Sequence, residues 1–217
     1  MNLKQCGRIS GLYAITPDEQ DTAQLLGKVR LALQGGAQVL QYRNKVADSK
    51  VRLEQARALR EVTSEFDIPL IINDDLSLAL SVAADGVHLG GADGSVADAR
   101  AVLGGGKLIG VSCYNRIALA HEAVSLGADY VAFGSFFNST VKPGAVTATF
   151  ELLRQAHDEI TVPLVAIGGI TLQNCVQLRE AGANALAVIS ALFGANDIQH
   201  TARQFATLIN VTNFFDH

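Results

Sequence analysis

The sequence predicts a single-domain (β/α)8 barrel, and three observations point to this fold class. Eight short apolar runs alternate with longer amphipathic stretches along the 217 residues. Similar short sequence motifs lead into four of these runs, which indicates a repeated βα unit. A chain of about 200 residues meets the lower size limit of such a barrel. An open doubly wound sheet is the competing fold, but no run carries the GxGxxG fingerprint that is typical of it.

The expected strands are the short runs rich in apolar and β-branched residues. They are GLYAIT (11–16), QVLQYR (38–43), LIIND (70–74), GVHLG (86–90), LIGVSC (108–113), YVAFGSF (130–136), LVAIGG (164–169) and ALAVIS (185–190). Between them, residues 22–34 and 51–63 carry apolar residues at helical spacing and predict helices.

The repeated motifs lead into four of the expected strands. They are GGAQV (35–39), AADGV (83–87), LGADYV (126–131) and AGANAL (181–186). Each motif has a glycine or another small residue, then a polar residue, then the start of the strand. This pattern is typical of a helix end that turns into a strand. With no linker or low-complexity tract, we expect one domain over residues 1–217.

Composition restricts the class of protein. Hydrophobic residues make up 49% of the chain and charged residues 18%, which suits a full apolar core. The net charge of -4 argues against a general nucleic-acid binder, although it leaves room for a local basic pocket. The three cysteines (6, 113 and 175) are far apart and predict reduced thiols. No apolar run is long enough to span a bilayer and no signal-like segment begins the chain, so we expect a cytoplasmic protein that does not bind membranes.

Polar side chains follow the expected strands at the ends where a barrel builds its active site. Gln41, Arg43 and Lys45 alternate along the second run, so they should share one face of the strand. The third run ends in Asn73 and Asp74. A regular strand would point these two side chains to opposite faces, so the chain has to bend there if both are to contribute to one site.

Charge at these strand ends predicts a magnesium–diphosphate site. Arg43, Lys45 and Lys142 supply positive charge, while Asp74 and Asp93 supply hard oxygen ligands. Mg²⁺ binds a few carboxylates together with phosphate oxygens, and arginine and lysine neutralise the remaining phosphate charge. Each motif alone also has a structural interpretation, such as a solvated turn, and the hypothesis depends on their occurrence together.

The seventh and eighth runs end in features that favour phosphate binding. Gly168 and Gly169 end the seventh run, and Ile189 and Ser190 end the eighth. Glycine-rich backbone before a helix N-terminus is where barrels often bind phosphate.

Other polar residues predict structural roles. Asp75 is expected to cap the helix that follows it. His88, inside a strand pattern, is expected to be a hydrogen-bonded core residue rather than a ligand, and Cys113 a small apolar filler rather than a nucleophile.

At these residues the sequence resembles the thiamine-phosphate synthase (thiamine-phosphate pyrophosphorylase) family. The shared motifs occur in order from about residue 11 to residue 194: GLYAITP, QYRNK, LIINDD, DGVHLG, IGVSC, ADYVAFGSFF, AIGGIT and AVISALF. The resemblance implies a (β/α)8 barrel and a Mg²⁺-dependent transferase of thiamine biosynthesis. Its reaction would join 4-amino-2-methyl-5-(diphosphooxymethyl)pyrimidine to thiazole phosphate, giving thiamine phosphate and diphosphate.

The resemblance also implies a role for each matching residue. The pyrimidine diphosphate would be bound by Gln41, Arg43, Lys45, Asn73, Ser112 and Lys142. The metal would be held by Asp74 and Asp93, and catalysis would depend on Arg43 and Lys142. The thiazole phosphate would be bound by Ser139, Thr140, Val141, Gly168, Gly169, Ile189 and Ser190. The chain departs from the family's Thr-x-Thr-Lys pattern at Val141, where a hydroxyl is missing.

Two alternatives stay open on the sequence alone. One is a sugar-phosphate isomerase barrel, although no evident glutamate, lysine or histidine base is present for it. The other is a thiazole tautomerase-like or non-catalytic barrel that binds thiazole phosphate. The expected partners are small phosphorylated molecules, and the oligomeric state, including a homo-oligomer, is left open.

Overall fold

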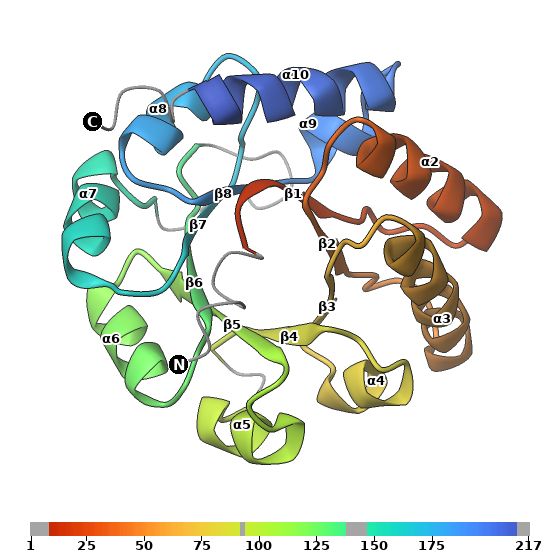
Figure 1. Ribbon diagram of the computed structural model, residues 1–217, viewed down its shortest axis with the longest axis horizontal. Coiled ribbons are helices and arrows are strands. Elements are labelled where there is room, and N and C mark those ends of the chain that lie inside the picture. Colours follow the sequence, from red (N-terminus) through yellow and green to blue (C-terminus); the bar gives the residue numbers. More distant parts are fainter. Residues whose placement is uncertain (1–8, 92–93, 138–146, 212–217) are drawn as a thin grey trace.

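Eight parallel strands close into a barrel in the computed structural model, which describes residues 9–91, 94–137 and 147–211 (Figure 1). The strands pair in sequence order, and β8 closes the ring by pairing with β1. They are β1 (Gly11–Ile15), β2 (Val39–Tyr42), β3 (Leu70–Asn73), β4 (Gly86–Leu89), β5 (Leu108–Tyr114), β6 (Tyr130–Phe133), β7 (Leu164–Ile167) and β8 (Ala185–Val188). Each strand falls on one of the eight predicted runs, so the predicted fold class is confirmed.

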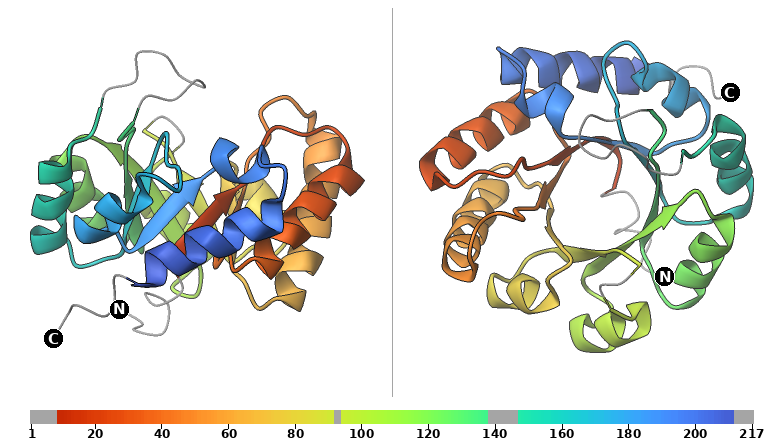
Figure 2. Two further views of the ribbon diagram at one scale, coloured as in Figure 1. Left: turned by 90° about the horizontal axis from the view of Figure 1, so that it is seen from above. Right: turned by 180° about the vertical axis from the view of Figure 1, so that it is seen from behind.

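Helices surround the barrel on the outside (Figures 1 and 2). They are α2 (Thr22–Gln34), α3 (Ser49–Glu65), α4 (Leu76–Ser81), α5 (Val96–Leu103), α6 (Ile117–Ser125), α7 (Phe150–Glu159), α8 (Cys175–Glu180), α9 (Ser190–Phe193) and α10 (Ile198–Val211). The predicted helix over 22–34 is α2, and the one over 51–63 lies within α3. No helix in the described ranges combines the length and apolar character that a bilayer crossing requires.

The last helix, α10, runs alongside α2 and α8 in Figure 1. Its contact with the end of α2 is close because Gly35 has no side chain there. A methyl group on Gly35 would lie 2.4 Å from the Ala202 Cβ of α10. This glycine therefore brings the C-terminal helix against the first βα unit.

Residues alternate along the strands between two apolar regions. One face of the sheet packs against the helices, and the other fills the barrel interior. The interior cluster consists of Ile9, Tyr13, Ile15, Val39, Ile71, Leu108, Tyr130, Ala132, Val165, Ala185 and Ala187. Glycine makes room for its largest members, because a methyl group on Gly110 would lie 1.9 Å from the Tyr130 Cζ. The interior is thus a packed core below the mouth of the barrel.

The four repeated motifs form equivalent turns at the N-terminal end of the strands. One small residue of each motif has a positive φ, with values of 105° at Gly36, 51° at Ala83, 99° at Gly127 and 104° at Gly182. A left-handed residue of this kind ends a helix and reverses the chain. The sequence pattern of a repeated αβ connection is therefore confirmed.

In three of these motifs the polar side chain accepts a hydrogen bond from the neighbouring strand. Asp85 Oδ2 accepts from the Leu70 N–H at 2.9 Å, and Asp129 Oδ2 accepts from the Ile109 N–H at 2.7 Å. Asn184 Oδ1 accepts in the same way from the first N–H of β7, at 2.7 Å. Each side chain satisfies a backbone donor that the start of a strand would otherwise leave without a partner.

Two of these carboxylates also form ion pairs with arginines on the surrounding helices. Arg60 of α3 pairs with Asp85, and Arg100 of α5 pairs with Asp129. The pairs tie α3 to β4 and α5 to β6 at the end of the barrel opposite the predicted site.

Candidate active site

The end of β2 places the first group of predicted residues. Gln41 faces the barrel interior and is 4% exposed, on the same face as Val39. Beyond the strand, Thr16 bonds Arg43 twice, because its Oγ1 accepts from the Arg43 N–H and donates to the Arg43 carbonyl, both at 2.9 Å. The Arg43 guanidinium lies 3.4 Å from Asp18 Oδ1, which also accepts from the Lys45 N–H at 2.7 Å.

A buried amide network supports the turn that carries Arg43 and Lys45. Asn44 is 6% exposed, and its Nδ2 donates to Gln55 Oε1 at 3.0 Å. The Tyr42 hydroxyl donates to the same oxygen at 2.8 Å. Burial raises the pKa of Tyr42 to about 12, so this hydroxyl keeps its proton near neutral pH. The sequence analysis assigned no role to Asn44; here it positions the cations on either side of it.

The chain bends at the end of β3 as the proposed site requires. Asn73 is the last residue of the strand and pairs in register with His88. Asp74 then has a φ of 63°, and its N–H donates to the His88 carbonyl at 2.8 Å. This left-handed residue breaks the strict alternation of a strand. The next residue, Asp75, accepts from the Leu78 N–H at 2.9 Å, which confirms its expected role as the helix cap.

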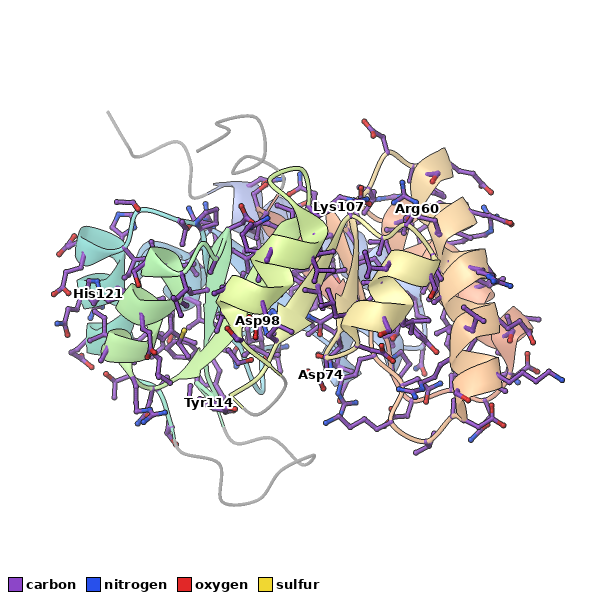
Figure 3. The ribbon with its side chains drawn as sticks, turned by 90° about the horizontal axis from the view of Figure 1, so that it is seen from below. Arg60, Asp74, Asp98, Lys107, Tyr114 and His121 are labelled. Carbon is purple, nitrogen blue, oxygen red and sulfur yellow. The ribbon has the colours of Figure 1, made fainter. Side chains whose placement is uncertain are left out.

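A pocket of about 580 Å³ opens between the ends of β2 and β3 and the helices that follow them. Its polar wall includes Arg43, Lys45, Arg52, Asn73, Asp74 and Asp75. Figure 3 shows Asp74 at the opposite end of the barrel from Arg60 and Lys107. Four residues predicted for one site from two different strands therefore share one pocket: Arg43, Lys45, Asn73 and Asp74.

Arg52 is a pocket residue that the sequence analysis missed. It lies in the first turn of α3, and its Nη1 is 3.7 Å from Asp75 Oδ2. Its Nε is buried and has no hydrogen-bond partner in the part of the chain that the structure describes. A cation in the first turn opposes the helix dipole. That unfavourable position is the sequence signal that could have identified it.

The predicted metal ligands are only partly described. Asp74 lines the pocket, whereas Asp93 lies outside the described residues. Within the described ranges no group of three or more His, Cys, Asp or Glu side chains could hold a metal ion. One carboxylate beside several cations still suits a Mg²⁺–phosphate group, because Mg²⁺ often takes one or two protein carboxylates and completes its shell with phosphate and water.

The predicted thiazole-phosphate residues divide into two groups. Ser139, Thr140 and Val141, together with Lys142 of the pyrimidine-diphosphate set, lie outside the described residues. Gly168 and Gly169 follow β7 with φ values of 104° and 65°.

The Gly168–Gly169 turn has a structural explanation that does not depend on phosphate binding. A methyl group on Gly168 would lie 2.1 Å from Ser135 Oγ, so close packing alone requires glycine there. Asn174 closes the turn, because its Nδ2 donates to the Gly169 carbonyl at 3.0 Å and its Oδ1 accepts from the Thr171 N–H at 2.8 Å. The turn is therefore held in one shape by its own hydrogen bonds.

Backbone donors at the ends of β7 and β8 remain available to a ligand. Ile189 precedes Ser190, the first residue of α9. Within the described part of the chain, the N–H groups of Gly169 and Ser190 have no hydrogen-bond partner. Both belong to residues predicted to bind phosphate.

Ser112, on β5, joins a polar group inside the barrel. Its Oγ lies 2.9 Å from His88 Nε2, and His88 Nδ1 lies 3.1 Å from the Tyr130 hydroxyl. His88 is 8% exposed. The prediction of a hydrogen-bonded core histidine is confirmed, and its partner is one of the predicted substrate residues.

Cys113, next to Ser112, points to the other side of the sheet. It is fully buried in the outer apolar core, and burial raises the pKa of its thiol to about 12. A thiol with this pKa holds very little thiolate near neutral pH, so the prediction of an apolar filler is confirmed.

Known proteins share this architecture and sequence. Residues 12–192 match the family described as thiamine monophosphate synthase. The chain is 50% identical to the thiamine-phosphate synthase of Nitrosospira multiformis, over 98% of this chain and 93% of that protein. It is 54% identical to the enzyme of the same name from Methylobacillus flagellatus, over 93% of this chain and 96% of that protein.

A solved structure agrees with these sequence matches. The thiamine phosphate pyrophosphorylase of Pyrococcus furiosus superposes with a TM-score of 0.84 at 33% identity, covering 97% of this chain and 98% of that one. Because the family match and the high identities cover nearly the whole barrel, the chain belongs to the thiamine monophosphate synthase family.

Proposed function

We propose that this chain is a thiamine-phosphate synthase. Its reaction would join 4-amino-2-methyl-5-(diphosphooxymethyl)pyrimidine to thiazole phosphate and release diphosphate. The observation that carries the proposal is the pocket at β2 and β3, which is lined by Arg43, Lys45 and Arg52 together with Asp74 and Asn73. Family membership supplies the reaction, and the pocket supplies groups that suit one of its substrates.

The pocket cations would bind the diphosphate of the pyrimidine substrate. Besides Asp74, two carboxylates of the described residues lie near these cations: Asp18 is 3.4 Å from Arg43, and Asp75 is 3.7 Å from Arg52. Arginine forms two parallel hydrogen bonds to a phosphate, and lysine adds a compact charge. The buried Nε of Arg52 would gain a phosphate oxygen as its missing partner.

Asp74 would hold Mg²⁺ beside this diphosphate, with Asp93 as the second proposed ligand. When bound, Mg²⁺ would neutralise phosphate charge in the departing diphosphate. The positive φ of Asp74 turns its carboxylate away from the regular strand direction, which supports this role.

The chain's own residues would promote the reaction mainly by charge and position. Arg43 and Lys142 would stabilise the negative charge that develops as the carbon–oxygen bond to diphosphate breaks. The electron-rich aminopyrimidine can carry the positive charge left on its methylene carbon, and the thiazole nitrogen would then attack that carbon. Gln41 and Ser112 would orient the pyrimidine, so that holding the two reactants together supplies much of the rate.

The thiazole phosphate would bind across the ends of β7 and β8. The N–H groups of Gly169 and Ser190, which have no partner among the described residues, are suitable donors to a phosphate, and glycine lets the backbone approach closely. Ile189 would contact the ring from the same loop. Ser139, Thr140 and Val141 would complete this subsite in the family's manner.

Diphosphate release tests the proposal directly. The purified protein is given the aminopyrimidine diphosphate with and without thiazole phosphate, in Mg²⁺ or in EDTA. We expect release only with both substrates and Mg²⁺, together with an equal amount of thiamine phosphate. No release under any condition would refute the synthase and favour a barrel that only binds or tautomerises thiazole phosphate.

A further inference from the structure

A chain of hydrogen bonds crosses the barrel interior and joins Gln41 to Ser112. We propose that Tyr13, Tyr130 and His88 form a positioning relay that makes Gln41 a hydrogen-bond acceptor and Ser112 a hydrogen-bond donor toward the bound pyrimidine. The relay would thereby select an aminopyrimidine over its oxo analogue. This inference rests on the proposed function, because it concerns the pyrimidine subsite of the same reaction.

The contacts of the relay are continuous and come from five strands. Gln41 Nε2 on β2 donates to the Tyr13 hydroxyl of β1 at 3.0 Å. The Tyr13 and Tyr130 hydroxyls lie 2.9 Å apart, and the Tyr130 hydroxyl of β6 lies 3.1 Å from His88 Nδ1. His88 Nε2 on β4 lies 2.9 Å from Ser112 Oγ on β5. Both ends of the relay are therefore predicted pyrimidine-binding residues, and its middle is not.

The middle of the relay is sealed from water. Tyr13 is 1% exposed and Tyr130 is 0% exposed. Burial raises the pKa of both tyrosines well above the ordinary value, so both hydroxyls keep their protons. Stacking adds rigidity, since the His88 and Tyr130 ring centroids are 5.6 Å apart. Water cannot replace a missing partner here without opening the barrel core.

With the Gln41 amide oriented so that Nε2 donates to Tyr13, the number of protons sets the direction of the remaining hydrogen bonds. Tyr13 accepts from Gln41, so its single proton is donated to Tyr130, and Tyr130 in turn donates to His88 Nδ1. A neutral imidazole that accepts at Nδ1 carries its proton on Nε2, which is donated to Ser112 Oγ. The Ser112 proton is then left for a ligand, and so is the amide oxygen of Gln41.

This polarity matches the proposed substrate. An exocyclic amino group would donate to the Gln41 oxygen, while a ring nitrogen or a phosphate oxygen would accept from Ser112. A 4-oxo analogue would place a carbonyl oxygen against the Gln41 oxygen, and two acceptors facing each other in a buried site are unfavourable. A rotated Gln41 amide would accommodate the analogue, but it would turn its oxygen toward the Tyr13 hydroxyl, so every hydrogen bond of the relay would have to reverse and His88 would have to move its proton to Nδ1. The relay thus opposes the rotation.

Binding of two matched ligands tests the relay. The probes are the monophosphates of 4-amino-5-hydroxymethyl-2-methylpyrimidine and of its 4-oxo analogue, and Kd is measured by calorimetry for the wild type and for Tyr130→Phe. We expect the wild type to prefer the amino ligand by at least about 100-fold, since a site with fixed polar groups rejects the wrong partner strongly. We expect Tyr130→Phe to reduce that preference at least about tenfold, mainly by tighter binding of the oxo ligand.

Control variants separate this effect from a loss of stability. Phe205→Leu removes volume from the core beneath α10, outside the barrel, and should lower the melting temperature without changing the Kd ratio. Tyr13→Phe is the second variant and should change the ratio as Tyr130→Phe does. His88→Gln, which can still accept and donate, should keep more of the preference than His88→Leu.

Each outcome decides the matter. An unchanged Kd ratio in folded Tyr130→Phe or folded Tyr13→Phe would overturn the relay, as would a wild type that does not distinguish the ligands or binds neither. Because binding is measured without turnover, a protein that shows the expected ratio but releases no diphosphate would refute the proposed function and retain the relay.

Discussion

At the N-terminal end of the strands the charged side chains pair with one another, whereas at the C-terminal end cations gather around a pocket. Arg60 pairs with Asp85 and Arg100 with Asp129 at the first end. Arg43, Lys45 and Arg52 line the pocket at the second end. Figure 3 separates the two ends, with Arg60 near one and Asp74 near the other.

The contrast shows what each end is for. A carboxylate that accepts from both an arginine and a strand N–H, as Asp129 does, has its bonding completed by the fold itself. A buried guanidinium nitrogen for which the described residues supply no partner, such as Arg52 Nε, is left for a partner of another kind, which we propose to be the diphosphate. Substitutions at the two ends should therefore have opposite effects on stability and on activity.

The largest expected effect is on activity, from Asp74→Asn at the pocket. Asparagine keeps the size of the side chain and tolerates the positive φ of this position, so the melting temperature should not change. Loss of the carboxylate should lower kcat/KM at least about 100-fold, equivalent to about 2.7 kcal/mol of transition-state stabilisation. Steady-state kinetics and thermal melts on the same sample give both numbers. A variant with wild-type kinetics would remove Asp74 from the site.

The next largest effect is on stability, from Asp129→Ala at the opposite end. It leaves the partly buried Arg100 without its ion-pair partner and the Ile109 N–H without its acceptor. The free energy of unfolding should fall by about 2–4 kcal/mol, while kcat at low temperature stays near the wild-type value. Urea unfolding followed by circular dichroism measures the loss. Asp129→Asn, which can still accept from the Ile109 N–H, should lose less; equal losses would mean that the strand N–H bond contributes nothing.

Asn184→Ala tests the same device without a formal charge. Asn184 occupies the equivalent position in the repeated motif at 181–186 and accepts a hydrogen bond from the Leu164 N–H. Removal of this neutral hydrogen bond should cost about 1–2 kcal/mol of unfolding free energy, which is less than the charged case. The comparison of the two urea midpoints checks the order. A larger loss for Asn184→Ala than for Asp129→Ala would contradict the view that the ion pair adds to the strand bond.

The repeated motifs explain why much of the fold could be predicted from the sequence. The positive-φ residues at 36, 83, 127 and 182 and the polar residues that follow them are local devices, so a short window of sequence reveals them. The strands were predicted correctly as well, because each is short and buried on both faces and therefore reads as a short apolar run. Ion pairs such as Arg60–Asp85 join residues 25 apart, and no local pattern identifies which arginine meets which carboxylate.

Residues of the site were predictable where they follow a strand directly. Arg43, Lys45, Asn73 and Asp74 stand beside the apolar runs that place them, and the pocket unites them. Arg52 escaped prediction because it reaches the pocket from a helix, where its contribution depends on how α3 packs. The interior relay escaped for a similar reason: Tyr13 and Tyr130 are 117 residues apart, and each by itself resembles an ordinary core aromatic residue.

The smallest effect is expected from an ion pair that belongs to neither end. Arg30 of α2 and Glu65 of α3 form two hydrogen bonds on the surface, with side chains that are 42% and 52% exposed. Solvent screens such pairs, so Arg30→Gln should leave the melting temperature at pH 7 within measurement error of the wild type.

The hydrogen bond from Arg30 lowers the pKa of Glu65. A lowered folded-state pKa means that any contribution is present at neutral pH and is lost as the pH falls through that pKa, so wild type and variant should become identical in acid. Thermal melts across this range check the result; a clear drop at pH 7 would show that paired charges stabilise this barrel even where water reaches them, and the contrast between its two ends would then be one of position alone.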